Sequence, residues 1–328
     1  MSAISVLPYA ATLEHWWEQL RGESGRLRFM AWKVLEVVAF CGVWPRARSS
    51  RTNQTPTAWL PPPSRPNNAV GAAPSVVVVV PARIQTASDA TRLQSLLVAL
   101  ASQTRWAHVV VVDDASPRWP QTQNAEVIRL PHNNGPAAAR NRGLQRALEL
   151  SAEIVAFTDA DCVPDSAWIE KIIQAFHLDR SAHAISGATL SKDQSWLGRY
   201  HERNGTLNGR RLAGSECLLY GPTCNLALCA DLAAVLRFDE SFPFAAAEDI
   251  DFCCRAIMTG WQIRHSTHAV VWHDFGYDQQ GVVGRLERFW KQFRKYGHGE
   301  RVLLQKQPDY PRLFAFSQEI PVCEREQA

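Results

Sequence analysis

Apolar runs and amphipathic segments alternate between residues 75 and 164. The apolar runs have the length and β-branched content of buried strands, and the segments between them carry apolar residues at helical spacing. The predicted strands are 75–80, 108–112, 127–130 and 154–158, and the predicted helices are 91–103 and 136–150. Continuous apolar strands separated by helices are typical of a mostly parallel sheet covered on both faces. The pattern predicts a Rossmann-like α/β fold.

The distribution of apolar and polar residues outside this region indicates further segments of the chain. Residues 29–44 are apolar and aromatic, but Lys33 and Glu36 interrupt them and they are shorter than the ~20 residues of a spanning helix. A helix lying peripherally in a membrane interface and a helix packed on the main domain are both consistent with this segment. We expect a helical segment over 1–44, a proline-rich linker over 45–74, the main domain over 75–280, and a basic, aromatic helical extension over 281–328.

Composition narrows the class of protein. The 328 residues are 46% hydrophobic and 20% charged, which describes a globular protein. A formal net charge of +3 is too small to favour nucleic acid as a partner, whereas anionic substrates or a membrane surface stay open. The eight cysteines form no C-x-x-C pair, and the N-terminal residues do not resemble a secretory signal. We therefore expect reduced thiols in a cytoplasmic protein.

Carboxylates gather where the predicted strands end. Asp159 and Asp161 follow the strand at 154–158, and residues two apart at a strand end point the same way. Hard oxygen ligands suit a divalent cation such as Mg²⁺ or Mn²⁺, although a lone Asp-x-Asp can also cap a helix. Asp113 and Asp114 follow the strand at 108–112. Like charges cost stability unless a cation or ligand offsets them, so a ligand site at this edge is the better explanation.

Two common phosphate sites are missing from the sequence. The first strand continues into VVVVVPARIQ, which lacks the glycine-rich turn of a dinucleotide-binding dehydrogenase, and no G-x-x-x-x-G-K-[ST] loop is present. The strand ends carry carboxylates and not the glycines of a phosphate-binding loop. Because carboxylates bind metal ions, we expect phosphate to be held through a metal ion.

The chain resembles the family 2 glycosyltransferases, which have the GT-A fold. The matching segments are VVVVVPAR, VVVDDAS, NNGPAAARNRGL, FTDADCVP, GPTCNLAL, RFDESFPFAAAEDIDFCCRAIMTG and VVWH, between residues 76 and 273. The resemblance implies an inverting transferase that moves a sugar from a nucleotide-activated donor, a UDP-sugar or GDP-sugar, with Mg²⁺ or Mn²⁺. The acceptor could be a glycan, a lipid-linked molecule or a peptide.

The same resemblance assigns residues to the donor. Pro81, Ala82 and Arg83 would form the nucleoside pocket together with Asp113, which would hydrogen-bond the base or ribose. Gly135 would let the chain approach the base closely.

The metal site follows from the family's D-x-D motif. Asp161 would bind the metal directly, and Asp159 would contact the ribose or reach the metal through water. His273 would complete the site, since a neutral imidazole is a suitable ligand, although a structural role is the alternative for a lone histidine.

The catalytic acids are expected at Glu248 and Asp249, which match the family's acidic pair. Asp249 would deprotonate the acceptor hydroxyl, and Glu248 would contact the acceptor or the helix N-terminus; the two roles could be exchanged. Placement of acids at a helix start for its dipole is the structural alternative.

Residues 191–220 and 285–301 bear on the acceptor and on the number of sugars added. Residues 285–301 lack the Q-x-x-R-W motif of processive synthases, which favours addition of a single sugar. Within residues 191–220, we expect Trp196, Tyr200, His201 and Arg210 to contact the acceptor. The alternatives are a catalytically inactive protein that binds sugar nucleotides as a scaffold, and a nucleotidyltransferase.

Overall fold

The structure is a computed structural model that describes residues 34, 38 and 74–321, except 194, 243, 278 and 279. Val34 and Val38 are helical, and the rest of the expected segment 1–44 and almost all of the expected linker 45–74 lie outside the described residues. None of the helices described here combines the length and the apolar character needed to cross a membrane.

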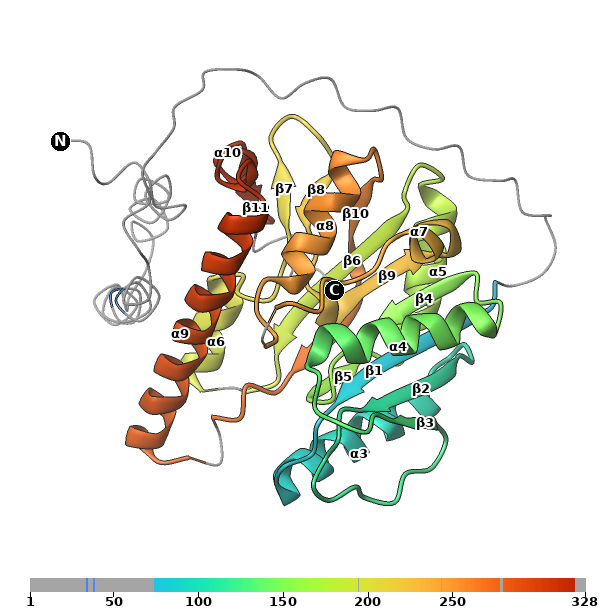
Figure 1. The fold of residues 1–328 in the computed structure, drawn as a ribbon, viewed down its shortest axis with the longest axis vertical. Helices are drawn as coiled ribbons and strands as arrows, with labels where there is room; N and C mark the ends of the chain where they lie inside the picture. Colours follow the sequence, from blue (N-terminus) through green and yellow to red (C-terminus); the bar gives the residue numbers. More distant parts are fainter. Residues whose placement is uncertain are drawn as a thin grey trace.

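One large sheet forms the centre of the molecule (Figure 1). Its strands, in spatial order, are β3 (Glu126–Arg129), β2 (His108–Asp113), β1 (Val76–Ala82), β4 (Ile154–Phe157), β9 (Leu226–Cys229), β6 (Ala184–Ser191), β10 (Ile263–His273) and β5 (Cys162–Pro164). The first four are parallel, β9 runs antiparallel to both neighbours, β6 and β10 are parallel, and β5 is antiparallel to β10. The predicted mostly parallel sheet and its four strands are confirmed.

Helices cover the faces of this sheet. Helix α4 (Pro136–Glu149) packs on β1 and β2, and α3 (Ala87–Ala101) lies on the opposite side (Figure 1). Both correspond to predicted helices. Helix α5 (Trp168–Leu178) packs on β10 and β6, and α7 (Ala230–Val235) packs on β9 and β4. Helix α8 (Glu248–Met258) packs on the strand Leu218–Tyr220. The five valines of β1 are at most 3% exposed, so this strand forms the middle of the core.

Close approach of α4 to the sheet depends on Gly143. A Cβ at this position would lie 2.2 Å from Cγ1 of Val79 in β1. We expect Gly143→Ala to lower the free energy of unfolding by about 1–3 kcal/mol, because the stiff valine cannot move away in a packed core. Gly281→Ala is the matched control: Gly281 has φ −64° and open space around its Cα, and urea unfolding of this variant should resemble the wild type. Equal stability of the two variants would contradict the close packing.

The C-terminal residues complete a second, smaller sheet. It has the order β11 (Ser317–Glu319), β7 (Arg210–Leu212) and β8 (Leu218–Tyr220), all antiparallel. The long helix α9 (Val282–Lys306) and the short α10 (Tyr310–Ala315) lead to β11 and run along one side of the molecule (Figure 1). The segment expected as an extension therefore pairs by backbone hydrogen bonds with residues of the expected main domain.

A separate aromatic cluster joins α6 (Trp196–Arg203) to α9. It consists of Leu197, Tyr200, Phe275, Tyr277, Phe289 and Phe293. His201 stacks within it on Phe275 at 4.1 Å between ring centroids, and its Nε2 lies 2.8 Å from the Tyr277 hydroxyl. Tyr200 and His201 are each 2% exposed, so the expectation that they contact an acceptor is wrong: their aromatic rings pack against the apolar face of α9.

Candidate active site

A cavity of about 640 Å³ opens at the edge of the main sheet where β1 and β4 end. Nine of the ten residues assigned to the site from the sequence line it. They are Pro81, Ala82, Arg83, Gly135, Asp159, Asp161, Glu248, Asp249 and His273. The exception is Asp113.

Asp113 lies behind the cavity wall. It is fully buried, accepts a hydrogen bond from the Ser116 backbone N–H at 2.8 Å and pairs with Arg129 Nη1 at 3.1 Å. The neighbouring Asp114 lines the cavity, where it accepts hydrogen bonds from the backbone N–H groups of Asn134 (2.7 Å) and Gly135 (3.0 Å). Both carboxylates therefore hold loops in place, and the contact of Asp113 with a nucleoside stays a prediction.

Gly135 begins helix α4 in a conformation that glycine favours. Its φ is +87°, and Pro136 follows as the first helical residue. No heavy atom lies within 4 Å of the position that a Cβ would take. The glycine is thus required for its backbone angle, and it leaves the cavity open beside the loop that Asp114 holds.

Arg140 links the two acidic groups of the site. From α4 its Nη1 donates to Glu248 Oε1 at 2.6 Å, and its Nη2 donates to Asp159 Oδ1 at 3.0 Å. The side chain is 2% exposed. Burial lowers the pKa of Arg140, but the charges of Asp159 and Glu248 outweigh it and raise the pKa above its usual value. Arg140 therefore fixes the end of β4 relative to the start of α8.

Loss of this buried cation should destabilise the protein strongly. We expect Arg140→Met to lower the free energy of unfolding by about 3–5 kcal/mol, because Asp159 and Glu248 would lose their shared partner inside the protein. Arg146→Met is the control, since Arg146 lies on the same helix and also pairs with two carboxylates, Glu126 and Glu149, but near the surface. Chemical denaturation should show a much smaller loss for the control. Similar losses in both variants would contradict the linking role of Arg140.

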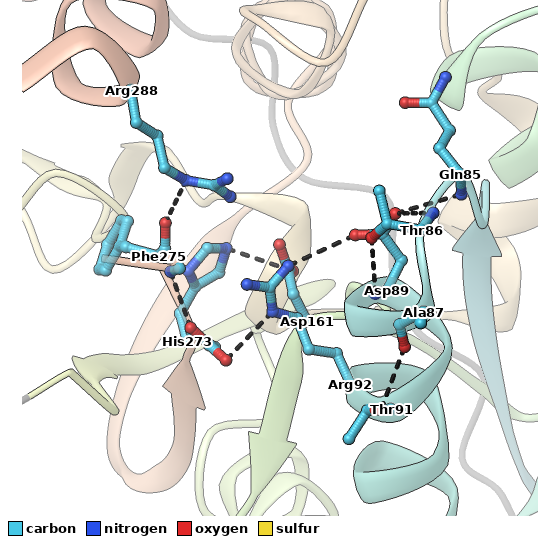
Figure 2. Close-up of polar contacts among 12 residues, drawn as sticks. Gln85, Thr86, Ala87, Asp89, Thr91, Arg92, Asp161, His273, Phe275 and Arg288 are labelled. Atoms are coloured by element: carbon cyan, nitrogen blue, oxygen red, sulfur yellow. Dashed lines mark hydrogen bonds and ion pairs between the residues drawn. The ribbon is translucent and has the colours of Figure 1, made fainter. Parts of the chain in front are cut away.

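Asp161 and His273 face one another across paired strands. His273 in β10 lies opposite Cys162 in β5, which brings its Nε2 to 3.4 Å from Asp161 Oδ1 (Figure 2). The imidazole rests against Phe275 at 4.5 Å between ring centroids. Desolvation raises the pKa of Asp161, and the nearby His273 counteracts part of that rise. The pair consists of a carboxylate and an imidazole held by rigid strands at the cavity edge.

The arrangement fits a divalent cation. Ligand atoms of Mg²⁺ lie at about 2.0–2.1 Å from the ion, so two ligands of one ion can be up to about 4.2 Å apart. The 3.4 Å between His273 Nε2 and Asp161 Oδ1 satisfies this limit. The Cys162 sulfur lies in the same cluster, but burial raises its pKa, so it is a protonated thiol and a poor ligand.

Glu248 and Asp249 begin helix α8 and differ in their surroundings. Glu248 is 2% exposed and bound to Arg140. Asp249 accepts hydrogen bonds from the backbone N–H groups of Ile250 (2.8 Å) and Thr223 (3.3 Å). Desolvation in the cavity wall and then the charge of Glu248 raise the pKa of Asp249 to about 7. Asp249 is thus the carboxylate suited to exchange a proton near neutral pH.

Two arginines that the sequence analysis did not single out lie beside Asp161 and His273 (Figure 2). Arg92 of α3 donates from Nε to Asp274 at 3.1 Å, and Arg288 of α9 donates from Nε to the Phe275 carbonyl at 2.6 Å. Their Nη2 atoms converge on Gly276, where a Cβ would be 2.6 Å from one and 2.8 Å from the other. Two arginines thus line the cavity next to the candidate metal ligands, and Arg92 is paired there with Asp274 and Asp89.

Comparison with known proteins shows similarity to glycosyltransferases. Residues 77–236 match the sequence profile described as Glycosyl transferase family 2. The pre-mycofactocin glycosyltransferases of Mycobacterium tuberculosis strains CDC 1551 / Oshkosh and ATCC 25618 / H37Rv are each 30% identical to the chain over 263 residues, 76% of this chain and 50% of theirs. The chain therefore spans about half the length of these curated relatives.

A solved structure shares the fold. The mannosyltransferase PcManGT from Pyrobaculum calidifontis, in complex with GDP-Man and Mn²⁺, is 18% identical, with a TM-score of 0.50 over 95% of this chain and 83% of that chain. The predicted GT-A architecture is confirmed. Residues 77–236, just under half of the chain, are similar to glycosyl transferase family 2.

Proposed function

We propose that this cavity binds a nucleotide-diphospho-sugar and transfers its sugar, one unit at a time, to an acceptor hydroxyl. One observation carries the proposal: the acidic pair Glu248 and Asp249 lines the same cavity as Asp159, Asp161 and His273. In sugar transfer from a nucleoside diphosphate, a proton acceptor assists attack by the hydroxyl, and a metal ion can stabilise the charge on the leaving diphosphate. The donor would be a UDP-sugar or a GDP-sugar.

The leaving diphosphate would be held at the Asp161 end of the cavity. Asp161 and His273 would bind Mg²⁺ or Mn²⁺ directly, and Asp159 would contact the ribose or the metal through water. The bound ion would stabilise the charge that develops on the diphosphate. Arg92 and Arg288 would add positive charge beside it. The Mn²⁺ and GDP-Man in the complex of PcManGT support this type of donor site.

The nucleoside would lie next to the Pro81–Arg83 loop and Gly135. These residues line the cavity at the end of β1 and at the start of α4. Asp113 would reach the base or ribose only after its contact with Arg129 changes, because the carboxylate is now fully buried.

Asp249 would take the proton from the acceptor hydroxyl as that hydroxyl attacks the anomeric carbon. Arg140 holds the neighbouring Glu248, so the two carboxylates have separate tasks: Glu248 orients the start of α8 and Asp249 acts as the base. Attack from the side opposite to the leaving diphosphate inverts the anomeric configuration.

The pKa of Asp249 leads to a pH prediction. The base must be ionised, and its pKa of about 7 lies above the ordinary value of 3.8. We therefore expect kcat/KM to fall about tenfold for each pH unit below 7 and to level off above it. Donor affinity measured at the same pH values separates this effect from binding. A flat profile from about pH 5 to pH 8 would contradict Asp249 as the titrating base.

The direct test of the proposed reaction is release of nucleoside diphosphate from UDP-sugars and GDP-sugars, with Mn²⁺ and with a chelator. Water can serve as a slow acceptor, so the free sugar should appear first as the anomer inverted from the donor when followed by NMR. Release of nucleoside diphosphate at the same rate with the chelator, or a sugar product with retained anomeric configuration, would contradict the proposal.

A further inference from the structure

Glu300 is a buried carboxyl group without a partner. It lies in α9, is 9% exposed and lines the cavity. It makes no hydrogen bond or ion pair with any residue in the part of the chain that the structure describes. Because no described side chain holds its carboxyl group, Glu300 is available to contact a molecule in the cavity. An unpaired acid in the wall of a cavity indicates a contact with a ligand.

The nearest cation does not neutralise Glu300. Arg210 is committed to β11: its Nε donates to Ser317 Oγ at 2.9 Å, its Nη2 donates to the Ser317 carbonyl at 3.0 Å, and its Nη1 pairs with Glu319 at 3.4 Å. Burial raises the pKa of Glu300 to about 8, although Arg210 lowers it in part. At pH 7 the group is therefore mainly a neutral carboxylic acid, which carries one O–H donor and a carbonyl acceptor.

Aromatic side chains surround this end of the cavity. Tyr220 of β8, Tyr296 of α9, and Tyr310 and Phe314 of α10 all line it. The Arg210 guanidinium covers the Phe314 ring at 4.1 Å, which fixes that wall. Flat aromatic faces bind ring-shaped groups, and tyrosine hydroxyls add polar contacts at their edges.

The aromatic end adjoins the catalytic pair. A Cβ on Gly299 would lie 2.2 Å from the carbonyl oxygen of Ala246, so α9 contacts the chain just before Glu248 and Asp249. Glu300 follows at the next position. An acceptor whose hydroxyl reaches Asp249 would therefore extend its remaining atoms toward Glu300 and the tyrosines. The diphosphate side, at Asp161 and His273, lies on other strands of the sheet.

We propose that Glu300, Tyr220, Tyr296 and Tyr310 form the acceptor subsite, and that it selects an uncharged ring-bearing acceptor with a hydroxyl or amide group that pairs with the Glu300 carboxyl. The inference rests on the proposed sugar transfer and adds the class of acceptor. Among the described cations near this end, Arg210 is held by Ser317 and Glu319, and Lys295 of α9 interacts with Glu248, Asp159 and Asp161. Neither would balance a negative charge beside Glu300, so we expect anionic acceptors to bind more weakly at this end.

The test uses two probes that differ in one charge, phenyl β-glucoside and phenyl β-glucuronide, and the variants Glu300→Gln and Glu300→Leu. Glutamine keeps a donor and an acceptor, whereas leucine keeps only the volume. By calorimetry or saturation-transfer NMR, we expect the glucoside to bind the wild type and Glu300→Gln with similar affinity and to bind Glu300→Leu about tenfold more weakly. The glucuronide should bind the wild type at least about tenfold more weakly than the glucoside.

Titration of UDP-sugars and GDP-sugars with Mn²⁺ distinguishes failure of the proposed function from failure of the acceptor subsite alone. If no nucleotide-sugar binds, the proposed function fails. Suppose that a donor binds but the glucoside binds Glu300→Leu and the wild type with equal affinity, or binds neither protein. The acceptor subsite is then overturned, and the donor site stands. Preference for the glucuronide would also overturn it. Donor affinity equal in all three proteins would show that the Leu variant is folded.

Discussion

Replacing Asp249 by asparagine is expected to lower the rate of sugar transfer by about 10²–10⁴-fold while leaving donor affinity nearly unchanged. The amide keeps the size of the side chain, and its oxygen can still accept the hydrogen bond from Ile250, but it cannot take a proton from the acceptor. Turnover measured at saturating donor, together with donor affinity by calorimetry, separates the lost proton transfer from lost binding.

Asp231→Asn is the matched control for this variant. Asp231 also lies in the first turn of a helix, α7, but it does not line the cavity. If a carboxylate near a helix N-terminus mattered only through the helix dipole, both variants would have similar small effects on stability and none on turnover. A normal rate in Asp249→Asn would mean that another group accepts the proton, and Glu248 would then be tested in the same way.

The second large effect is expected from Asp161→Ala. Removal of this carboxylate leaves His273 without the oxygen ligand 3.4 Å away, so we expect turnover with Mn²⁺ to fall at least about 100-fold. Mn²⁺ affinity, measured from the electron paramagnetic resonance signal of the free ion in the presence of nucleoside diphosphate, should fall in parallel. Excess Mn²⁺ should restore part of the activity if the ion still binds through the remaining groups.

Asp165→Ala controls for the loss of a nearby negative charge. Asp165 is exposed, lies four residues further along the chain and does not line the cavity. Its removal should leave Mn²⁺ affinity and turnover close to those of the wild type. Unchanged Mn²⁺ affinity in Asp161→Ala would contradict the assigned metal site, whatever happens to turnover.

The sequence predicted the parallel half of the main sheet well. Strands β1, β2, β3 and β4 are continuous or β-branched apolar runs, and the helices between them have clear spacing, so local pattern identifies them. It did not predict β9, which is inserted antiparallel between β4 and β6, or the small sheet of β7, β8 and β11. The pairing of β9 with β4 joins residues about 70 positions apart, and that of β11 with β7 joins residues more than 100 positions apart, which local pattern does not record.

The sequence predicted the site residues that lie at the ends of strands. Asp159 and Asp161 follow an apolar strand directly, and the carboxyl ends of neighbouring parallel strands share one edge of a sheet. Arg140 was the main omission: it falls on the same helical face as the buried Leu144 and Ala147, a signal that a charge on an apolar face has a buried partner. Its partners could not be inferred, because Glu248 is 108 positions away.

The roles of Tyr200, His201 and Glu300 depend on their burial, which the sequence does not show. Tyr200 and His201 look like surface contacts in sequence, but α9 covers them. Glu300 lies in a charged helical segment that suggests solvent exposure, whereas it is 9% exposed and lines the cavity. Both outcomes depend on how the C-terminal residues fold back on the main sheet, and no local spacing predicts that return.

The most direct test of the central claim is a calorimetric titration of the purified protein with UDP-sugars and GDP-sugars, first with Mn²⁺ and then with a chelator. We expect one nucleotide class to bind in the presence of Mn²⁺ and this binding to be lost with the chelator. Absence of binding to either class with Mn²⁺ present would contradict a donor site in this cavity, and binding that persists unchanged with the chelator would contradict the assignment of Asp161 and His273 as its metal ligands.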